Sequence, residues 1–438
     1  MIKQIIFLVT LLLTLGIFAW TMKRVFSYFA LLKPAYPIKD IGKRIKLTLE
    51  VALGQTKILR RPVVGTIHAL VWWGFLVILF GSIEMVIDGL TGTERVLSVL
   101  GGFYDFMVAA GDIFGLVITI AIIIFLIRRN IIKVKRFEGP EMKKISHQDA
   151  NVALLIILAL MLSLLGMNTF YQIGCLQSGE EIKGVYPVSS LLVPLWQNLP
   201  QSTVHFWHEF NWWAHILLIF LFANILPYSK HFHVFMSVPN VFLSRLQPLG
   251  YIDNMPNITE EVKLMLDPNA AFAEPPADEG EPERFGVKDV EDATWKNYLD
   301  SLSCTQCGRC TSVCPANTTG KLLSPRKLMI DFRARMKEKG PGLVKDKNYD
   351  DGKSLLRDYI TEEELWACTL CNACAQECPI NMNHPSLVVA MRRYLVMEEA
   401  AAPAELNAIF QNIENNGAPW QFSPEDRLNW AEEIYVNQ

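Results

Sequence analysis

The run Cys304-Thr-Gln-Cys307-Gly-Arg-Cys310-Thr-Ser-Val-Cys314-Pro315 determines how the last third of this chain folds. The same spacing, C-x₂-C-x₂-C-x₃-C-P, recurs at Cys368, Cys371, Cys374, Cys378 and Pro379. These two runs contain eight of the nine cysteines in the chain. Such closely spaced, repeated thiols are typical of metal ligands, so the sequence predicts metal-bound sulfur here.

This spacing favours iron–sulfur clusters over zinc. In bacterial two-cluster ferredoxins the run holds [4Fe–4S] clusters, and the fourth cysteine of each run binds the cluster of the other run. Zinc sites pair two short C-x₂-C knuckles instead, so a zinc-binding, non-redox scaffold is the weaker alternative. We therefore predict two crossed ligand sets. The first cysteine set is Cys304, Cys307, Cys310 and Cys378, and the second is Cys368, Cys371, Cys374 and Cys314.

The first half of the chain is predicted to lie in a membrane. Hydrophobic residues make up 51% of the 438 residues, and they concentrate in residues 1–230. Five stretches approach the ~20 apolar residues that cross a bilayer, namely 5–22, 64–87, 106–127, 152–167 and 210–228. Lys23 and Arg24 follow the first stretch, which favours a span over a cleaved signal peptide. The net charge of −3 gives no indication of nucleic-acid binding.

The basic residues of the loops predict the orientation. Ten Lys or Arg residues lie between the first two spans and seven between the third and fourth, whereas each of the other two loops contains one, Arg95 or Lys183. Because basic loops stay on the cytoplasmic side, we predict an outside N-terminus and a cytoplasmic cysteine-rich half. A reducing compartment suits eight thiolate ligands. Cys175, assigned to the long outer loop, is interpreted as a free thiol.

Three histidines lie in or beside the predicted spans. His68 lies near the cytoplasmic end of the second span, His215 near the outer end of the fifth, and His233 just past its inner end. Ionisable residues in spans are costly and usually functional, although a histidine can also simply hydrogen-bond a neighbour. In one continuous helix, His215 and His233 would be ~27 Å apart. His68 and His233 are therefore predicted to share a depth and bind one iron, whereas His231 is interpreted as solvated.

The segment from His215 to His233, with Pro227 twelve residues after its start, resembles the last span of the nitrate reductase gamma-subunit family, a five-span b-type cytochrome. The resemblance covers about residues 1–245. It implies haem b on His68 and His233 and a membrane quinone as substrate. A second haem on His215 lacks its expected partner, because Ile78 stands at that position. The alternatives there are an outer haem, a quinone pocket or proton release, involving His205, His208, Glu84 and Asp112.

The cysteine-rich half is predicted to be helical. Residues 267–283 carry six acidic residues and four prolines without Lys or Arg, which is typical of a disordered linker. Ser324-Pro325 indicates the start of a helix over 326–339, and a second helix follows His384-Pro385. This half resembles the α-helical ferredoxin module of heterodisulfide reductase subunits and of the succinate dehydrogenase iron–sulfur subunit. Those heterodisulfide-reductase relatives carry a Cys-Cys-Gly repeat that does not occur here.

These features predict an all-α protein in three parts. They are a five-helix transmembrane cytochrome b bundle (1–245), a juxtamembrane segment with the acidic linker (246–293), and an α-helical two-cluster ferredoxin domain (294–438). The predicted function is a subunit of the bacterial cytoplasmic membrane that passes electrons between a cytoplasmic partner and the quinone pool. It would use two [4Fe–4S] clusters and one or two haem b groups. The alternative is a quinol-oxidising subunit that feeds a cytoplasmic disulfide or sulfur-compound reductase.

The expected partners follow from the resemblance. A separate iron–sulfur subunit with the Cys-Cys-Gly domain is expected to supply the site for a two-electron substrate. An electron-transferring flavoprotein is a second candidate, as an upstream donor.

Overall fold

The computed structural model describes residues 1–267 and 284–435, and every regular element in that part of the chain is a helix. Five helices are long and apolar enough to cross a membrane, so the all-α class and the five-span count are confirmed. They are α1 (Ile2–Ser27), α4 (Pro62–Thr91), α5 (Gly102–Asn130), α6 (Lys144–Ser178) and α8 (Gln201–Ile225).

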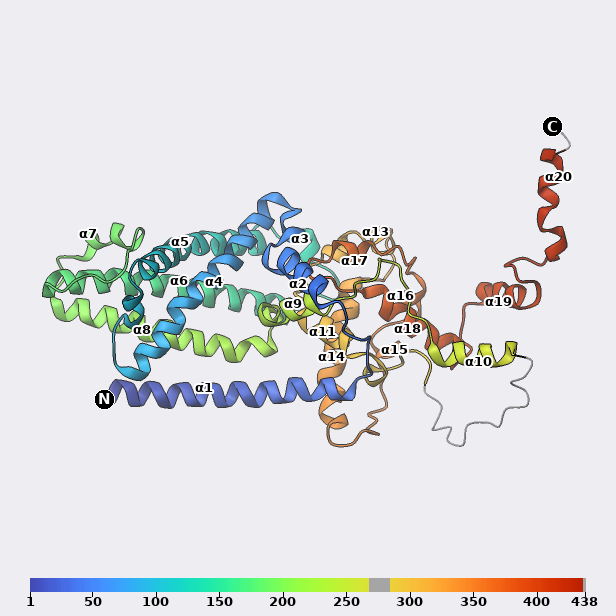
Figure 1. The fold of residues 1–438 in the computed structure, drawn as a ribbon, viewed down its shortest axis with the longest axis horizontal. Helices are drawn as coiled ribbons and strands as arrows, with labels where there is room; N and C mark the ends of the chain where they lie inside the picture. Colours follow the sequence, from blue (N-terminus) through green and yellow to red (C-terminus); the bar gives the residue numbers. More distant parts are fainter. Residues whose placement is uncertain (268–283, 436–438) are drawn as a thin grey trace.

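The spanning helices α4, α5, α6 and α8 pack into a bundle, with α1 along one side (Figure 1). Four of these helices extend past both ends of the apolar stretches that predicted them, because the helical hydrogen bonds continue through the flanking polar turns, whereas α8 starts earlier than its stretch and ends at Ile225. One consequence corrects the sequence analysis. Cys175 is not in a loop: it lies in the last turns of α6 and is buried.

The fifth span does not continue as one helix to His233. Pro227 has no N–H to donate, and α8 ends at Ile225. Two 3₁₀ turns, Leu226–Tyr228 and Lys230–Phe232, follow before the chain starts α9 (His233–Phe242). The predicted separation of ~27 Å between His215 and His233 assumed one continuous helix, and that assumption is wrong. The two histidines nevertheless line different cavities.

The cysteine-rich half is a compact group of short helices around one long helix, α14 (Pro325–Leu343). Both helices predicted here are confirmed, the second as α18 (His384–Met397). Ser324 holds the N-cap position of α14, but its hydroxyl donates to Glu141 over 2.7 Å and does not cap the helix. The other helices of this half are α11 (Trp295–Ser303), α12 (Arg309–Ser312), α13 (Pro315–Thr318), α15 (Leu355–Asp358), α16 (Glu362–Trp366) and α17 (Ala373–Glu377).

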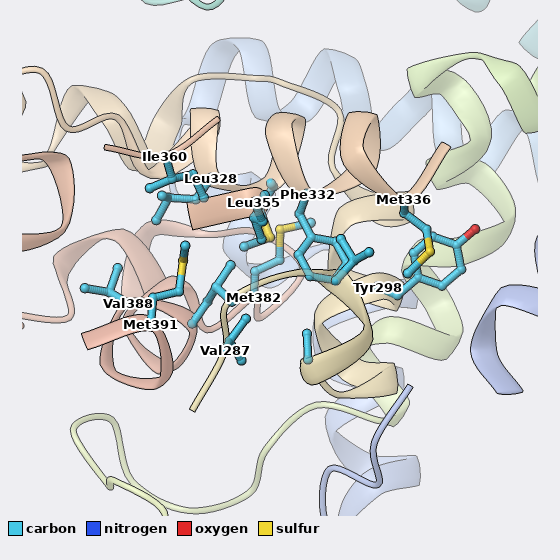
Figure 2. Packing of buried hydrophobic residues seen from close by; sticks show 14 of the residues in the cluster. Val287, Tyr298, Leu328, Phe332, Met336, Leu355, Ile360, Met382, Val388 and Met391 are labelled. Carbon is cyan, nitrogen blue, oxygen red and sulfur yellow. The ribbon is translucent and has the colours of Figure 1, made fainter. Parts of the chain in front are cut away.

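One hydrophobic core joins the two halves. Phe332 and Met336 of α14 pack with Tyr298 of α11 and with residues of α18 (Figure 2). The same core includes Val25 and Tyr28 from the end of α1. Because apolar burial is the main stabilising term in folding, a shared core ties the cysteine-rich half to the end of the bundle. Five shorter helices complete the first part of the chain: α2 (Ile41–Thr48), α3 (Thr56–Leu59), α7 (Val193–Trp196), α9 and α10 (Pro256–Leu266).

Buried arginines reinforce this junction. Arg326 of α14 is 1% exposed and pairs with Glu141, in the loop between α5 and α6, over 2.7 Å. It also donates to the carbonyl oxygens of Arg136 and Glu138, both over 2.8 Å. Arg333 donates to the Ser229 carbonyl over 3.0 Å. A buried pair needs such additional hydrogen bonds to offset desolvation, and here they fix the position of the cysteine-rich half.

The basic loops and the cysteine-rich half thus lie at the same end of the bundle, which we call the cluster end; the opposite end is the far end. The acidic linker prediction falls on residues 268–283, outside the described residues. After the cysteine-rich half, α19 (Ala404–Asn416) and α20 (Asn429–Tyr435) extend away from the rest of the molecule (Figure 1).

Candidate functional site

The cysteines gather around two cavities, and each cavity is lined by one crossed set. Cys304, Cys307, Cys310 and Cys378 line a cavity of about 280 Å³, which we call the junction cavity. The second cysteine set lines a separate cavity of about 20 Å³, which we call the small cavity. Each cavity therefore contains three cysteines of one run and the fourth cysteine of the other run. This is the arrangement that crossed cluster ligation requires.

The local backbone explains why each fourth cysteine leaves its own run. Cys314 and Cys378 both precede a proline, and both have extended backbone (φ −76°, ψ 118° and φ −65°, ψ 122°). The residue before a proline avoids the helical region. The three other cysteines of each run lie in a loop and a short helix, α12 or α17. The helix therefore stops before the Cys-Pro pair, and the fourth thiol points to the neighbouring set.

The electrostatics of these thiols fit a polynuclear metal group. Burial raises the pKa of Cys378 and of Cys374 to about 12, with neighbouring thiols contributing. Thiolates at such positions need a compensating cation, and four thiolates around one cavity are the donors that iron–sulfur clusters take. Within the described residues, no three Cys, His, Asp or Glu side chains converge on a single metal ion. The small cavity has less room, so a four-iron core there requires its cysteines to move outward. Cys371, the one exposed cysteine, lies on the open side.

The junction cavity also reaches the predicted haem ligands. His68 of α4 and His233 at the start of α9 both line it, together with the first cysteine set. The His233 Nδ1 lies 3.2 Å from the Lys230 carbonyl oxygen, which favours the tautomer with a free Nε2. The His68 Nδ1 is buried and has no hydrogen-bond partner among the described residues. Two imidazoles facing one cavity are a donor set that suits haem iron.

Cations surround the same cavity. Arg128 and Arg129 in the last turn of α5, and Arg136 in the loop after it, line the cavity. Lys230 and Arg309 also line it. The Nε and Nη2 atoms of Arg129 are buried without a hydrogen-bond partner among the described residues. Buried guanidinium groups are normally paired. An unpaired one beside two histidines suits a group with carboxylates, which the propionate substituents of haem provide.

His215 occupies a different environment, near the middle of α8 and not at the outer end that the sequence predicted. It is 2% exposed, and its Nδ1 lies 2.9 Å from the Leu160 carbonyl and 3.0 Å from the Ser163 Oγ. The pocket that it lines, which we call the far pocket, is about 50 Å³. This volume is less than a fifth of that of the junction cavity. Ile78 also lines the far pocket, and its side chain offers no ligand atom. These residues do not fit a second haem.

The acidic residues near the far end anchor loops. Asp112 is 1% exposed and accepts hydrogen bonds from the backbone N–H groups of Val188 and Ser189, over 2.8 and 2.9 Å. Glu84 is 2% exposed and accepts from the Leu97 N–H over 3.0 Å. Each carboxylate thus satisfies backbone donors of a connecting loop. Of the other candidates there, His205 is exposed, and the His208 Nε2 lies 3.5 Å from a Glu94 carboxylate oxygen.

Three residues near the cavities were overlooked or misassigned by the sequence analysis. His231 is half-buried and lines the junction cavity, so its assignment as a solvated residue was wrong. From the sequence, Arg129 is simply one of the basic residues between two spans, and His384 simply begins a helix. In the structure both residues line the junction cavity. No sequence motif marks these residues, because the chain segments that meet at the cavities are far apart in sequence.

Comparison with known proteins supports iron–sulfur clusters in the cysteine-rich half. Residues 296–379 match the family of 4Fe-4S dicluster domains. The protein contains a 4Fe–4S dicluster domain. Heterodisulfide reductase subunits of Methanosarcina species also match, over a quarter to a third of the chain, which confirms the predicted relationship of this half. No solved structure gives a significant match.

Two longer relatives match over most of this chain, and a third matches over about a third of it. The probable iron-sulfur-binding oxidoreductase FadF of Bacillus subtilis is 28% identical over 98% of this chain and 61% of its own length. The EtfAB:quinone oxidoreductase of Syntrophomonas wolfei is 27% identical over 91% of this chain and 55% of its own length. A probable membrane-anchored ferredoxin of Chromohalobacter salexigens is 36% identical over 34% of this chain and 24% of its own. The chain thus spans little more than half of the first two relatives.

Proposed function

We propose that this protein is a membrane-anchored electron-transfer subunit that passes electrons between a cytoplasmic partner and the quinone pool. The first and second cysteine sets would each hold a [4Fe–4S] cluster, and His68 with His233 would hold one haem b. When bound, these groups supply one-electron carriers. The bundle would lie in the bacterial cytoplasmic membrane with its cluster end toward the cytoplasm, in keeping with the basic loops at that end.

The junction cavity carries this proposal. One continuous space is lined by four cysteines of the cytoplasmic half and by two histidines at the end of the bundle. The chain builds this space rigidly: the Lys57 Nζ donates to the Cys378 carbonyl over 3.2 Å, and Arg309 donates to the Lys57 carbonyl over 3.1 Å. Rigid positioning of the carriers' ligands favours transfer because little reorganisation is then needed. A separate ferredoxin on a loose tether would not need these contacts.

The surface at Cys371 is the proposed entry for the soluble partner. Cys371 is the one exposed cysteine, so the second cysteine set lies nearest to solvent, and the first set lies against the bundle. This order runs from the cytoplasmic surface toward the membrane. The relative named EtfAB:quinone oxidoreductase supports an electron-transferring flavoprotein as the donor and a quinone as the acceptor. The partner with a Cys-Cys-Gly domain remains the second candidate.

The similarity to heterodisulfide reductase subunits favours the reverse direction as a second candidate function. In that case quinol would be oxidised at the membrane and a cytoplasmic disulfide or sulfur-compound reductase would receive the electrons. The same carriers serve both directions of electron transfer. The identity of the partner and the reduction potentials of the carriers decide which direction is used.

The test uses the full chain in detergent, purified without oxygen. We expect two cluster signals by EPR and one haem by optical spectroscopy after reduction with dithionite. Adding a short-chain quinone should reoxidise the haem and then the clusters, and the His233→Ala variant should lose quinone-dependent cluster reoxidation. Reduced carriers that do not react with quinone would overturn the proposal. Faster reduction by quinol than oxidation by quinone would select the second candidate.

A further inference from the structure

One buried histidine separates the two cysteine cavities. His384 is the first residue of α18, is 2% exposed, and lines the junction cavity as well as the small cavity. Of the described residues, His384 alone lines both. Pro385 at the second position of the helix fixes the backbone here, so the imidazole is held between the two cysteine sets.

The Nδ1 atom of His384 is buried and lacks a hydrogen-bond partner in the described part of the chain. Buried polar atoms in native proteins are nearly always paired, so an unpaired one on a residue that lines two cavities indicates a partner that is bound there. An imidazole carries at least one N–H donor in either protonation state.

The N–H donor of His384 should have its largest effect on a cluster in the small cavity, because that cavity has fewer other donors. The junction cavity is lined by several other strong donors, among them Arg309 and Arg136. The small cavity is lined by no Lys or Arg in the described part of the chain, and His384 is its one histidine. Hydrogen bonds to cluster sulfur stabilise the reduced, more negatively charged state and raise the reduction potential.

We propose that His384 donates its N–H to a sulfur atom of the cluster held by the second cysteine set and thereby raises the reduction potential of that cluster. The inference rests on the proposed function, because it assumes that this set holds a [4Fe–4S] cluster. No proton would be transferred: the cluster would accept one electron from the upstream donor, and the N–H···S hydrogen bond donated by His384 would become stronger.

Two measurements test the proposal. In protein labelled with ¹⁵N-histidine, pulsed EPR of the reduced second cluster should show a ¹⁵N coupling, with that cluster identified by its loss in Cys314→Ser. In His384→Leu, which keeps the side chain apolar and of similar size, the ratio of reduced to oxidised second cluster at a fixed potential should fall about tenfold. Tenfold is 59 mV for a one-electron couple. The first cluster is the internal reference.

The control is His384→Asn, whose side-chain amide places an N–H near the position of the imidazole Nδ1. We expect it to keep the second cluster's potential within about twofold of the unmodified protein, which a purely space-filling role for His384 does not require. An intact second cluster with no ¹⁵N coupling, or an unchanged potential in His384→Leu, overturns the inference alone. If His384→Leu loses the second cluster, two other measurements decide whether His384 donates to it. They are the ¹⁵N coupling in the unmodified protein and the reduction potential of the second cluster in His384→Asn. Absence of a second cluster in the unmodified protein would instead refute the proposed function.

Discussion

The two ends of the helix bundle contain the same kinds of residue in opposite arrangements. At the cluster end, His68, His233 and Arg129 border a cavity of about 280 Å³, and the buried Nδ1 of His68 and two nitrogens of Arg129 have no partner among the described residues. Farther along the bundle, around the far pocket of about 50 Å³, His215 in the middle of α8 and Asp112 of α5 are held by neighbouring side chains and backbone groups.

This difference shows which polar residues in a membrane span are free to bind a ligand. A span histidine is a candidate ligand whatever its surroundings, because burying it is costly. Around the far pocket, hydrogen bonds within the protein offset the cost of burying His215. At the cluster end, the buried nitrogens of His68 and Arg129 have no such partner among the described residues. Unpaired buried polar atoms beside a large cavity therefore distinguish a binding site from a structural network.

The largest expected effect is the loss of haem from one end only. His68→Ala and His233→Ala should each abolish the dithionite-reducible haem absorbance, because neither remaining histidine alone gives the bis-histidine coordination proposed here. His215→Ala should retain the full haem complement. Pyridine haemochrome quantification on equal amounts of purified protein measures this. Haem retained in both cluster-end variants, or lost in His215→Ala, would reverse the comparison.

The next effect concerns the clusters and sharpens the view of the cluster end. Cys314→Ser should perturb the cluster that is held by Cys368, Cys371 and Cys374, since Cys314 lines the small cavity with them. The cluster of the first set and the haem should keep their signals. EPR of the reduced protein measures both clusters. Cys378→Ser is the matching variant, and it should perturb the cluster of the first set instead. If each substitution altered the cluster of its own run, the ligation would not be crossed.

The sequence was sufficient to predict the five spans, two helices of the cysteine-rich half and the iron–sulfur character of that half. Spans appear as runs of apolar residues, and the α14 start appears as Ser324-Pro325, because both depend on neighbours in the chain. The repeated Cys-Pro spacing likewise is a local pattern, and the match to 4Fe-4S dicluster domains covers it.

The sequence could not predict how the halves meet. The contact between Arg326 and the Arg136 carbonyl joins residues 190 positions apart, and no periodicity reports such a pairing. The position of His231 was misjudged because Pro227 ends α8 and turns the chain inward. The roles of Asp112 and Glu84 were left open, since only the folded loops show that backbone N–H groups occupy their carboxylates.

A smaller effect, on stability, tests whether the cluster end is a fixed junction. Arg326→Met should destabilise the protein by about 3–5 kcal/mol, because it leaves the buried carboxylate of Glu141 without its cation. Thermal unfolding of the detergent-solubilised protein, followed by circular dichroism, measures the change. The control is Lys263→Met, which removes an exposed pair with Glu260 and should cost about 0.2–0.5 kcal/mol. Equal effects of the two substitutions would show that the halves are not tightly joined.

The smallest effect is expected near the far end, at Asp112. In Asp112→Asn, one carboxylate oxygen becomes an NH₂ group, which cannot accept from the Val188 and Ser189 N–H groups that now share the Asp112 Oδ2. Leaving such donors unsatisfied costs about 1–3 kcal/mol, and Asp105→Asn on the same helix is the control. The haem content, the cluster potentials and the rate of oxidation by quinone should not change, because a loop anchor acts only on stability. If quinone oxidation stopped while the unfolding temperature stayed the same, Asp112 would belong to a quinone or proton site, and the far end would be functional as well.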